Sequence, residues 1–152
     1  MKILNKVVIG MATLCLLTAC GPSKVSYAKF HEAAVEAVKK EVSYTKVTVK
    51  GTSKASSVSV ELDLEYTLKD GQWEMTKGDA VSALVGTVLI GMTADLVTED
   101  EKTTYYAGGG FKTVTKDGDD TGTVTWNANA RLTSIKGKTS SGSGDIKLTW
   151  SK

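Results

Sequence analysis

The stretch that decides the fold reads Val58-Ser59-Val60-Glu61-Leu62-Asp63-Leu64-Glu65-Tyr66-Thr67-Leu68, with an apolar side chain at every second position. Successive side chains of a strand point to opposite faces of a sheet, so this period predicts a strand with one buried and one wet face. Asp70-Gly71 then forms a two-residue hairpin turn, in which glycine readily takes a positive φ. Trp73 and Met75 continue the apolar face on the returning strand. The stretch therefore predicts an antiparallel hairpin.

The same alternation recurs on both sides of this hairpin. Residues 45–50 alternate before it, and strands are expected later around Tyr105, Tyr106, Phe111 and Val114, around Val124, Trp126, Ala128, Ala130 and Leu132, and around Ile146, Leu148 and Trp150. Asn127, Asn129, Arg131 and Thr133 are expected on the wet side of the second of these groups. Residues 108–110, three glycines, predict a bend or bulge, and residues 137–144 a flexible connection. Together these signals predict a curved antiparallel sheet of about six to eight strands.

Two segments show helical spacing. Tyr27 to Val42 is amphipathic, with Ser26 as its N-cap. Asp79 to Val97 is apolar nearly all round and is expected to be buried on several sides within the domain. By length it is also a candidate second membrane span, although Gly86, Gly91 and Asp95 lower its hydrophobicity. The expected fold is α+β, with an N-terminal amphipathic helix and a second, strongly apolar helix packed on one face of the sheet.

The N-terminus has the form of an export signal. Lys2 and Lys6 make a short positive region ahead of an apolar run from Val7 to Leu17. This run is too short for an ordinary membrane-spanning helix, which needs about 20 apolar residues. Residues 1–19 are therefore expected to be a signal peptide that is removed.

The end of this signal, Leu17-Thr18-Ala19-Cys20, resembles the lipobox of bacterial lipoproteins. The resemblance implies cleavage between Ala19 and Cys20, and a diacylglycerol on the Cys20 thiol that anchors the protein to a membrane. Residues 20–26 are then the lipidated cysteine and a short tether, and residues 27–152 a single α+β domain.

Charge and cysteine usage exclude two classes of function. Without Lys2 and Lys6, seventeen basic residues balance seventeen acidic ones, so no basic face for nucleic acid is expected. The two cysteines are Cys15, which leaves with the signal, and Cys20, which is modified. Neither a disulfide nor a thiolate metal site is therefore expected.

The sequence offers few residues in arrangements that would support catalysis. His31, the single histidine, lies beside no residue that would complete a dyad. Asp63 and Glu65 share one strand face with Glu61 and predict a solvated strip instead of a tuned pair of carboxyl groups. Residues 117–122 match the first half of a calcium loop, but Ala128 stands where the bidentate glutamate should be, so a polar hairpin turn is expected. The sequence therefore predicts no enzyme, no cofactor and no metal.

The order of elements resembles the LolA and LprG-like group of lipoprotein and lipid carriers, in which a curved antiparallel sheet wraps around helices and leaves an apolar cavity. The resemblance implies a cavity lined by the concave face and the inner helix, here by Leu62, Leu64, Tyr66, Trp73, Leu84, Val88, Met92 and Trp126. Plain core packing is the alternative role for these residues, because the chain is short.

Two functions remain open at this point. The first is a membrane-anchored carrier that holds a lipid-like or other apolar ligand between sheet and helix. The second is an interaction module of the cell envelope, an adhesin or accessory subunit, that binds a protein or glycan partner through its surface. Either would be anchored to the outer face of the cytoplasmic membrane, or to an outer membrane where one exists. Lys46, Lys50 and Lys69 form an exposed row that could contact anionic lipid.

Overall fold

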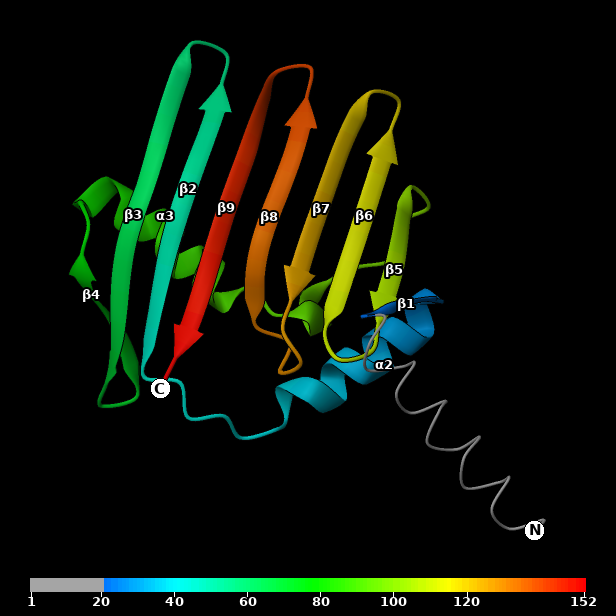
Figure 1. Ribbon diagram of the computed structural model, residues 1–152, viewed down its shortest axis with the longest axis horizontal. Coiled ribbons are helices and arrows are strands. Elements are labelled where there is room, and N and C mark those ends of the chain that lie inside the picture. Colours follow the sequence, from blue (N-terminus) through cyan, green and yellow to red (C-terminus); the bar gives the residue numbers. More distant parts are fainter. Residues whose placement is uncertain (1–20) are drawn as a thin grey trace, which may run out of the picture.

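The computed structural model describes residues 21–152 (Figure 1). The expected signal peptide and Cys20 lie outside the described residues. The described chain is an α+β fold with one antiparallel sheet of nine strands, where six to eight were expected. The elements in chain order are β1 (Ser23–Val25), α2 (Tyr27–Val38), β2 (Lys46–Ala55), β3 (Val58–Lys69), β4 (Gln72–Lys77), α3 (Ala80–Gly91), the 3₁₀ turn η1 (Ala94–Leu96), β5 (Thr103–Ala107), β6 (Phe111–Asp117), β7 (Asp120–Trp126), β8 (Leu132–Thr139) and β9 (Gly142–Ser151).

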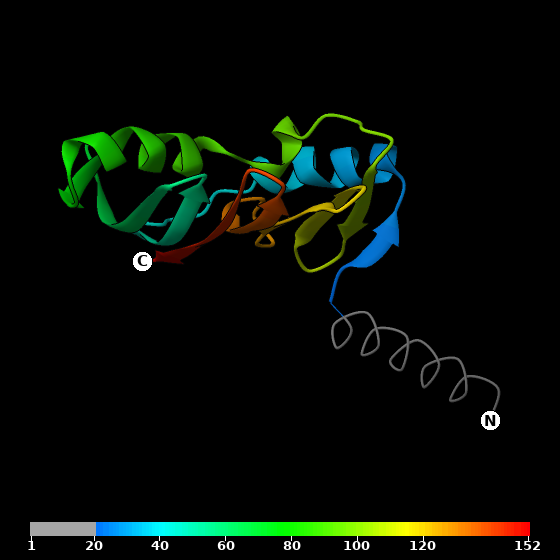
Figure 2. The same cartoon turned by 90° about the horizontal axis from the view of Figure 1, so that it is seen from above.

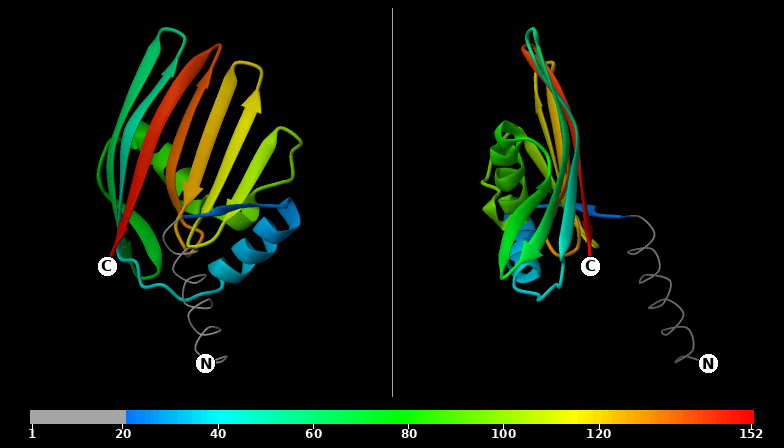
Figure 3. Two further views of the ribbon diagram at one scale, coloured as in Figure 1. Left: turned by 45° about the vertical axis from the view of Figure 1, so that its right-hand side comes forward. Right: turned by 90° about the vertical axis from the view of Figure 1, so that its left-hand side faces the viewer.

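The molecule has two layers. Both helices lie on one side of the sheet, α2 behind the β5 end and α3 behind the β3 end (Figures 1 and 2). We call this side the helix side and the opposite face of the sheet the outer face. The helices do not reach the end of the sheet formed by the β2–β3, β6–β7 and β8–β9 turns (Figure 3).

The strand order is β1-β5-β6-β7-β8-β9-β2-β3-β4. Each hairpin of the sequence pairs its own strands, and β2 joins the two halves because it pairs with both β3 and the last strand, β9. The sheet is therefore open, with β1 and β4 at its two edges.

Two groups of core residues pack between the sheet and the helices, one beneath α2 and one beneath α3. Beneath α2, Phe30 is fully buried and packs edge-on against Phe111 and Trp126, with ring centroids 5.6 and 6.2 Å away. Beneath α3, Leu89 and Ile90 are buried on the helix side of the sheet. A chain that begins at Gly21 contains all of the core residues that the structure describes.

Several local predictions are confirmed. Asp70 and Gly71 both take positive φ, 50° and 79°, in the turn between β3 and β4. This is the backbone that a two-residue hairpin favours. Ser26 caps α2 by accepting a hydrogen bond from the Lys29 amide at 3.4 Å. The helix ends at Val38, four residues earlier than expected.

Other local predictions were wrong in whole or in part. Of the bend or bulge expected at residues 108–110, the structure has the bend, which connects β5 to β6, while the bulges lie at Glu65/Tyr66 and Thr125/Trp126. Residues 137–144 belong largely to β8 and β9, which meet at a two-residue turn. Residues 23–25, expected in the tether, pair with β5 as an edge strand.

The strand expected to run through residues 124–132 is broken by a loop. The Asn127 side chain accepts hydrogen bonds from the amides of Asn129 and Arg131, both at 3.0 Å, and Ala130 takes a φ of 58°. An asparagine that bonds its own backbone offers the chain an alternative to the strand ladder. Asn127 and Asn129 are therefore in a loop and not on the wet side of a strand, and Arg131 forms an isolated antiparallel bridge with Thr93.

The strongly apolar segment is shorter as a helix than its composition suggested. α3 has 12 residues and ends at Gly91, and the chain then turns through η1. Over residues 21–152, no helix is both long and apolar enough to cross a membrane.

Candidate functional site

The direction in which α3 faces is set by its smallest residues. Ser82 and Gly86, four residues apart, are buried against β3. A Cβ on Gly86 would overlap the Tyr66 hydroxyl and lie 2.8 Å from Cδ1 of Leu64. The Tyr66 hydroxyl also donates a hydrogen bond of 2.9 Å to the carbonyl oxygen of Ala83. The helix therefore approaches the sheet along its stripe of small residues.

The large apolar side chains of α3 consequently point away from the sheet. Val81, Leu84, Val85 and Val88 are 81%, 75%, 44% and 64% exposed. Their spacing of three, four and seven residues places them on one side of the helix. The expectation that this helix is buried on several sides was wrong, because only one side of it packs on β3. We call these four residues the α3 apolar face.

The residues predicted to line a cavity do not all meet. Leu62, Leu64, Tyr66 and Trp126 are buried in the core, and Trp73 and Met92 pack partly buried against it. Leu84 and Val88 belong to the α3 apolar face and do not line a space between helix and sheet. The carbonyl oxygen of Met92 accepts a hydrogen bond from Nε1 of Trp126 at 3.1 Å, which closes the end of α3 onto β7.

The segment that contains and follows α3 is acidic. Residues 79–101 contain five acidic residues and no lysine or arginine. Asp79 caps the start of α3 by accepting from the amides of Val81 and Ser82, both at 3.0 Å; hydrogen bonding to the Ser82 side chain, and then to these amides, holds its pKa below its ordinary value. Asp95 lies in η1, just beyond the end of the helix, whereas Glu99, Asp100 and Glu101 lie beside α2 and β5, at the opposite end of the sheet from β3.

The outer face of the sheet is polar and carries two kinds of lysine. Those of the first kind are paired with carboxylates, in Lys46–Glu65, Lys50–Asp63, Lys77–Asp63, Lys69–Glu74 and Lys136–Asp145. Lys46, Lys50 and Lys69, expected to contact anionic lipid, are all of this kind. Those of the second kind form no ion pair within residues 21–152 and include Lys54, Lys138, Lys147, Lys112 and Lys116.

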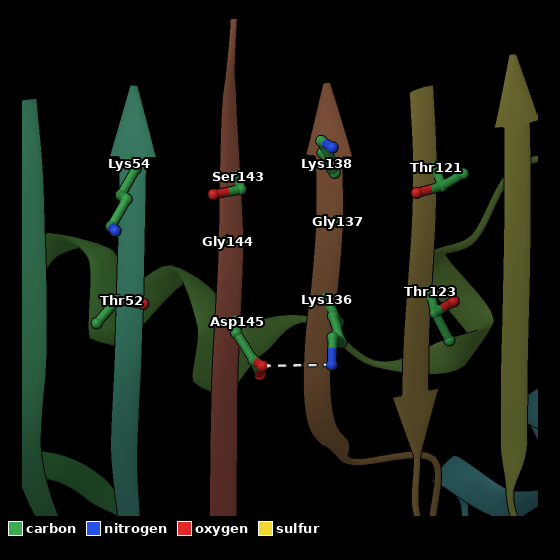
Figure 4. Close-up of a pocket in the computed structure, with 10 residues that line it drawn as sticks. All are labelled: Thr52, Lys54, Thr121, Thr123, Lys136, Gly137, Lys138, Ser143, Gly144 and Asp145. Atoms are coloured by element: carbon green, nitrogen blue, oxygen red, sulfur yellow. Dashed lines mark ion pairs between the residues drawn. The ribbon is translucent and has the colours of Figure 1, made fainter. Parts of the chain in front are cut away.

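Two rows of side chains cross β7, β8, β9 and β2 on the outer face, toward the end of the sheet formed by the hairpin turns (Figure 4). Register places Thr121, Lys138, Ser143 and Lys54 side by side in one row, and Thr123, Lys136, Asp145 and Thr52 in the next. Together with Gly137 and Gly144 they line a hollow of about 500 Å³, which we call the lysine hollow. Three lysines and one aspartate give its lining a net charge of +2.

The polar residues considered for catalysis are held in ordinary surface roles. The ring of His31 lies 5.7 Å from that of Tyr27, centroid to centroid. A hydrogen bond from Lys77 lowers the pKa of Asp63, and one from Lys46 lowers that of Glu65. The pKa of both groups is lowered, so neither has the raised pKa that the general acid of a carboxyl pair would need.

The calcium-like segment forms a hairpin turn, as expected. Asp117 pairs with Asp120 across the start of β6 and β7, and Gly118 takes a positive φ. The Asp117 carboxylate accepts a hydrogen bond of 2.6 Å from Lys102. Within residues 21–152, no three histidine, cysteine or acidic side chains gather as a metal site would require.

Two features of these surfaces were missed from the sequence. The first is the α3 apolar face, which the four-residue spacing of Ser82 and Gly86 could have indicated, because small residues mark the side of a helix that packs closely. The second is the lysine hollow, which depends on the pairing of β7, β8, β9 and β2. Compared with family models, curated proteins and solved structures, the chain shows no match.

Proposed function

We propose that this chain is a lipid-anchored protein of the bacterial cell envelope that works as an interaction module, with the α3 apolar face as its binding surface for a protein partner. The observation that carries the proposal is the exposure of Val81, Leu84, Val85 and Val88 together on one side of a helix. Single exposed apolar residues are ordinary, whereas contiguous patches are typical of interaction sites.

The spacing of these residues suits one mode of recognition. A helix that docks into an apolar groove presents anchors at positions i, i+3, i+4 and i+7, which is the spacing from Val81 to Val88. Burying what these four side chains still expose would contribute at least about 4 kcal/mol, at about 1.5 kcal/mol for a fully exposed side chain. Micromolar affinity requires about 8 kcal/mol net of the entropic cost of association, so further contacts are needed.

The acidic residues at the two ends of α3 indicate what those further contacts are. Asp79 lies at the start of α3, and Asp95 lies in η1 just beyond its end. A partner with an apolar groove and lysine or arginine at its rim would complement both features. A second copy of the chain would instead bring its own acidic residues to the contact, and an anionic bilayer would repel them.

The carrier function receives less support from the same geometry. A ligand held between helix and sheet would need apolar side chains of α3 that point inward. Ser82 and Gly86 occupy that side, close against Tyr66 and Leu64, and Leu84 and Val88 point outward. We therefore favour the interaction module over the carrier, and assign the protein no enzymatic role.

The lipid anchor has its own test. Replacing Cys20 with serine removes the thiol that would form the thioether to the lipid. In cells fed a fatty acid with an alkyne tag, we expect the unchanged protein to take up the tag and fractionate with membranes, and Cys20→Ser to do neither. Equal labelling of both proteins would show that Cys20 is not the anchor.

The binding surface is tested by photo-crosslinking in the native cell. A photoreactive amino acid at position 88 should give one discrete protein adduct, and one at Glu32, an exposed residue on α2, should not. Adding Leu84→Glu should abolish the adduct, and the partner's crosslinked peptide should be apolar with lysine or arginine nearby. Adducts of lipid mass, of a second copy, or none at all would overturn the proposal.

A further inference from the structure

The outer face keeps positive charge that the fold does not neutralise. Lys54 and Lys138 lie on either side of Ser143 in one cross-strand row, without a carboxylate in that row of the hollow. Lys147 and Lys50 face each other directly across β9 and β2. Like charges directly opposite each other destabilise a sheet. An anionic surface brought against this face would offset that repulsion.

The chain leaves the fold toward the same face. From α2, β1 runs back past the edge of the sheet to the side opposite the helices (Figures 2 and 3). Only Gly21 and Pro22 separate Cys20 from the start of β1 at Ser23. Three residue steps span about 10 Å at most. A lipid on Cys20 would therefore hold this corner of the domain close to the bilayer.

From these two observations we propose that the outer face lies against the anionic lipid surface of the bilayer, and that the lysine hollow receives the phosphates of lipid headgroups. This inference rests on the proposed lipid anchor, which supplies the bilayer. Headgroup phosphates would lie among the amines of Lys54, Lys136 and Lys138, beside the hydroxyl of Ser143. The α3 apolar face then points away from the membrane, where a partner can reach it.

The charges on the helix side favour this orientation over its reverse. On the helix side, the three lysines of residues 27–41 are balanced by three glutamates, while residues 79–101 carry five acidic side chains and no basic one. This side is therefore acidic on balance and would be repelled by anionic lipid. The outer face offers lysines that no carboxylate of the described chain pairs, each able to contribute about fivefold in binding near an anionic membrane.

The test uses the chain Gly21–Lys152 without lipid, which contains the whole described core. Co-sedimentation with vesicles of phosphatidylcholine and phosphatidylglycerol should show binding that weakens as salt shortens the Debye length. Vesicles of phosphatidylcholine alone should bind far less. Equal binding to both vesicles, or to neither, would overturn the inference. Because this chain lacks Cys20, failure of the anchor itself would not alter the result.

A pair of variants separates the hollow from net charge. Lys54→Gln with Lys138→Gln should weaken vesicle binding about 20- to 30-fold. Lys29→Gln with Lys40→Gln removes the same charge from exposed positions on and after α2, and should change binding less than about threefold. All four positions are exposed, so the fold should persist, which circular dichroism checks. Equal losses in both double variants would contradict the inference.

Orientation is read from a single fluorescent label, since both natural cysteines precede Gly21. An environment-sensitive dye at Ser143→Cys should shift to shorter wavelength when anionic vesicles are added. The same dye at Thr87→Cys, exposed on α3, should not shift. A shift at Thr87→Cys alone would show that α3 lies on the bilayer and would overturn the inference.

Discussion

Gly86 decides which side of α3 meets the sheet. The space that a side chain would need is taken by the Tyr66 hydroxyl and by Leu64. Because the helix meets the sheet on the side of Gly86, Leu89 and Ile90 are buried with it, and Val81, Leu84, Val85 and Val88 point outward. The exposure of the α3 apolar face is thus a consequence of one close contact.

Gly86→Ala should therefore destabilise the protein by up to about 2 kcal/mol. Overpacking a filled site costs about 1–3 kcal/mol, partly offset by the better helix propensity of alanine, about 1 kcal/mol. Urea unfolding measures the change. Gly91→Ala is the matched control, because a Cβ there meets nothing within 4 Å, and it should be neutral or slightly stabilising. Equal stability of the two variants would contradict the close contact.

Single residues also show what the sequence could reveal. Asp70-Gly71 was predicted as a hairpin turn because its chemistry is local. The turn at Asn127 was missed, since the alternation of Val124, Trp126, Ala128, Ala130 and Leu132 continued the strand pattern through it. The Asn127 side chain accepts hydrogen bonds from the backbone amides of Asn129 and Arg131, and these bonds favour a loop over a continued strand.

Among the elements, the two helices are held in different ways. α2 inserts Phe30 among the rings of Tyr105, Phe111 and Trp126, whereas α3 rests on β3 through small residues and two buried aliphatic ones. The helical period predicted both helices. A helix that is apolar on all sides, however, has no hydrophobic stripe to indicate which side packs on the sheet. The direction of α3 could therefore not be predicted from hydrophobicity alone.

Truncations along α3 should report this direction. Leu89→Ala, at a buried position, should cost about 2–4 kcal/mol of unfolding free energy, because it leaves a cavity. Leu84→Ala, at an exposed one, should change stability by less than about 0.5 kcal/mol. Thermal or urea unfolding compares the two. Similar losses at both positions would mean that Leu84 also packs in the core.

Ion pairs across β2, β3 and β4 make the outer face sensitive to acid. Hydrogen bonding to Lys77 lowers the pKa of Asp63 below 3.8, so the stability it contributes is present above that pH and is lost as pH falls through the lowered value. Asp63→Asn should reduce the loss of stability between neutral pH and about pH 3. Glu61→Gln, at an exposed position on the same strand, should leave that loss unchanged. Identical acid profiles for all three proteins would contradict this role of Asp63.

Over the whole molecule, the proposals form one arrangement. The bilayer lies on the outer face, the sheet separates it from the helices, and α3 presents its apolar face to a partner on the far side (Figure 2). The alternating strands and the two helices could be predicted from local patterns. The lysine hollow and the edge strand β1 could not, because each depends on which distant strands lie next to one another, and the exposed side of α3 was indicated only by the spacing of Ser82 and Gly86.

The central claim is that the α3 apolar face is free in the isolated chain and covered in the cell. Its most direct test is the rate at which a maleimide reacts with Leu84→Cys, measured on the chain Gly21–Lys152 and on the lipid-anchored protein in native membranes, where Cys20 is blocked. We predict a fast reaction in the isolated chain and a slow one in membranes, with Glu32→Cys on α2 reacting fast in both. A slow reaction in the isolated chain, or an equally fast one in membranes, would contradict the account.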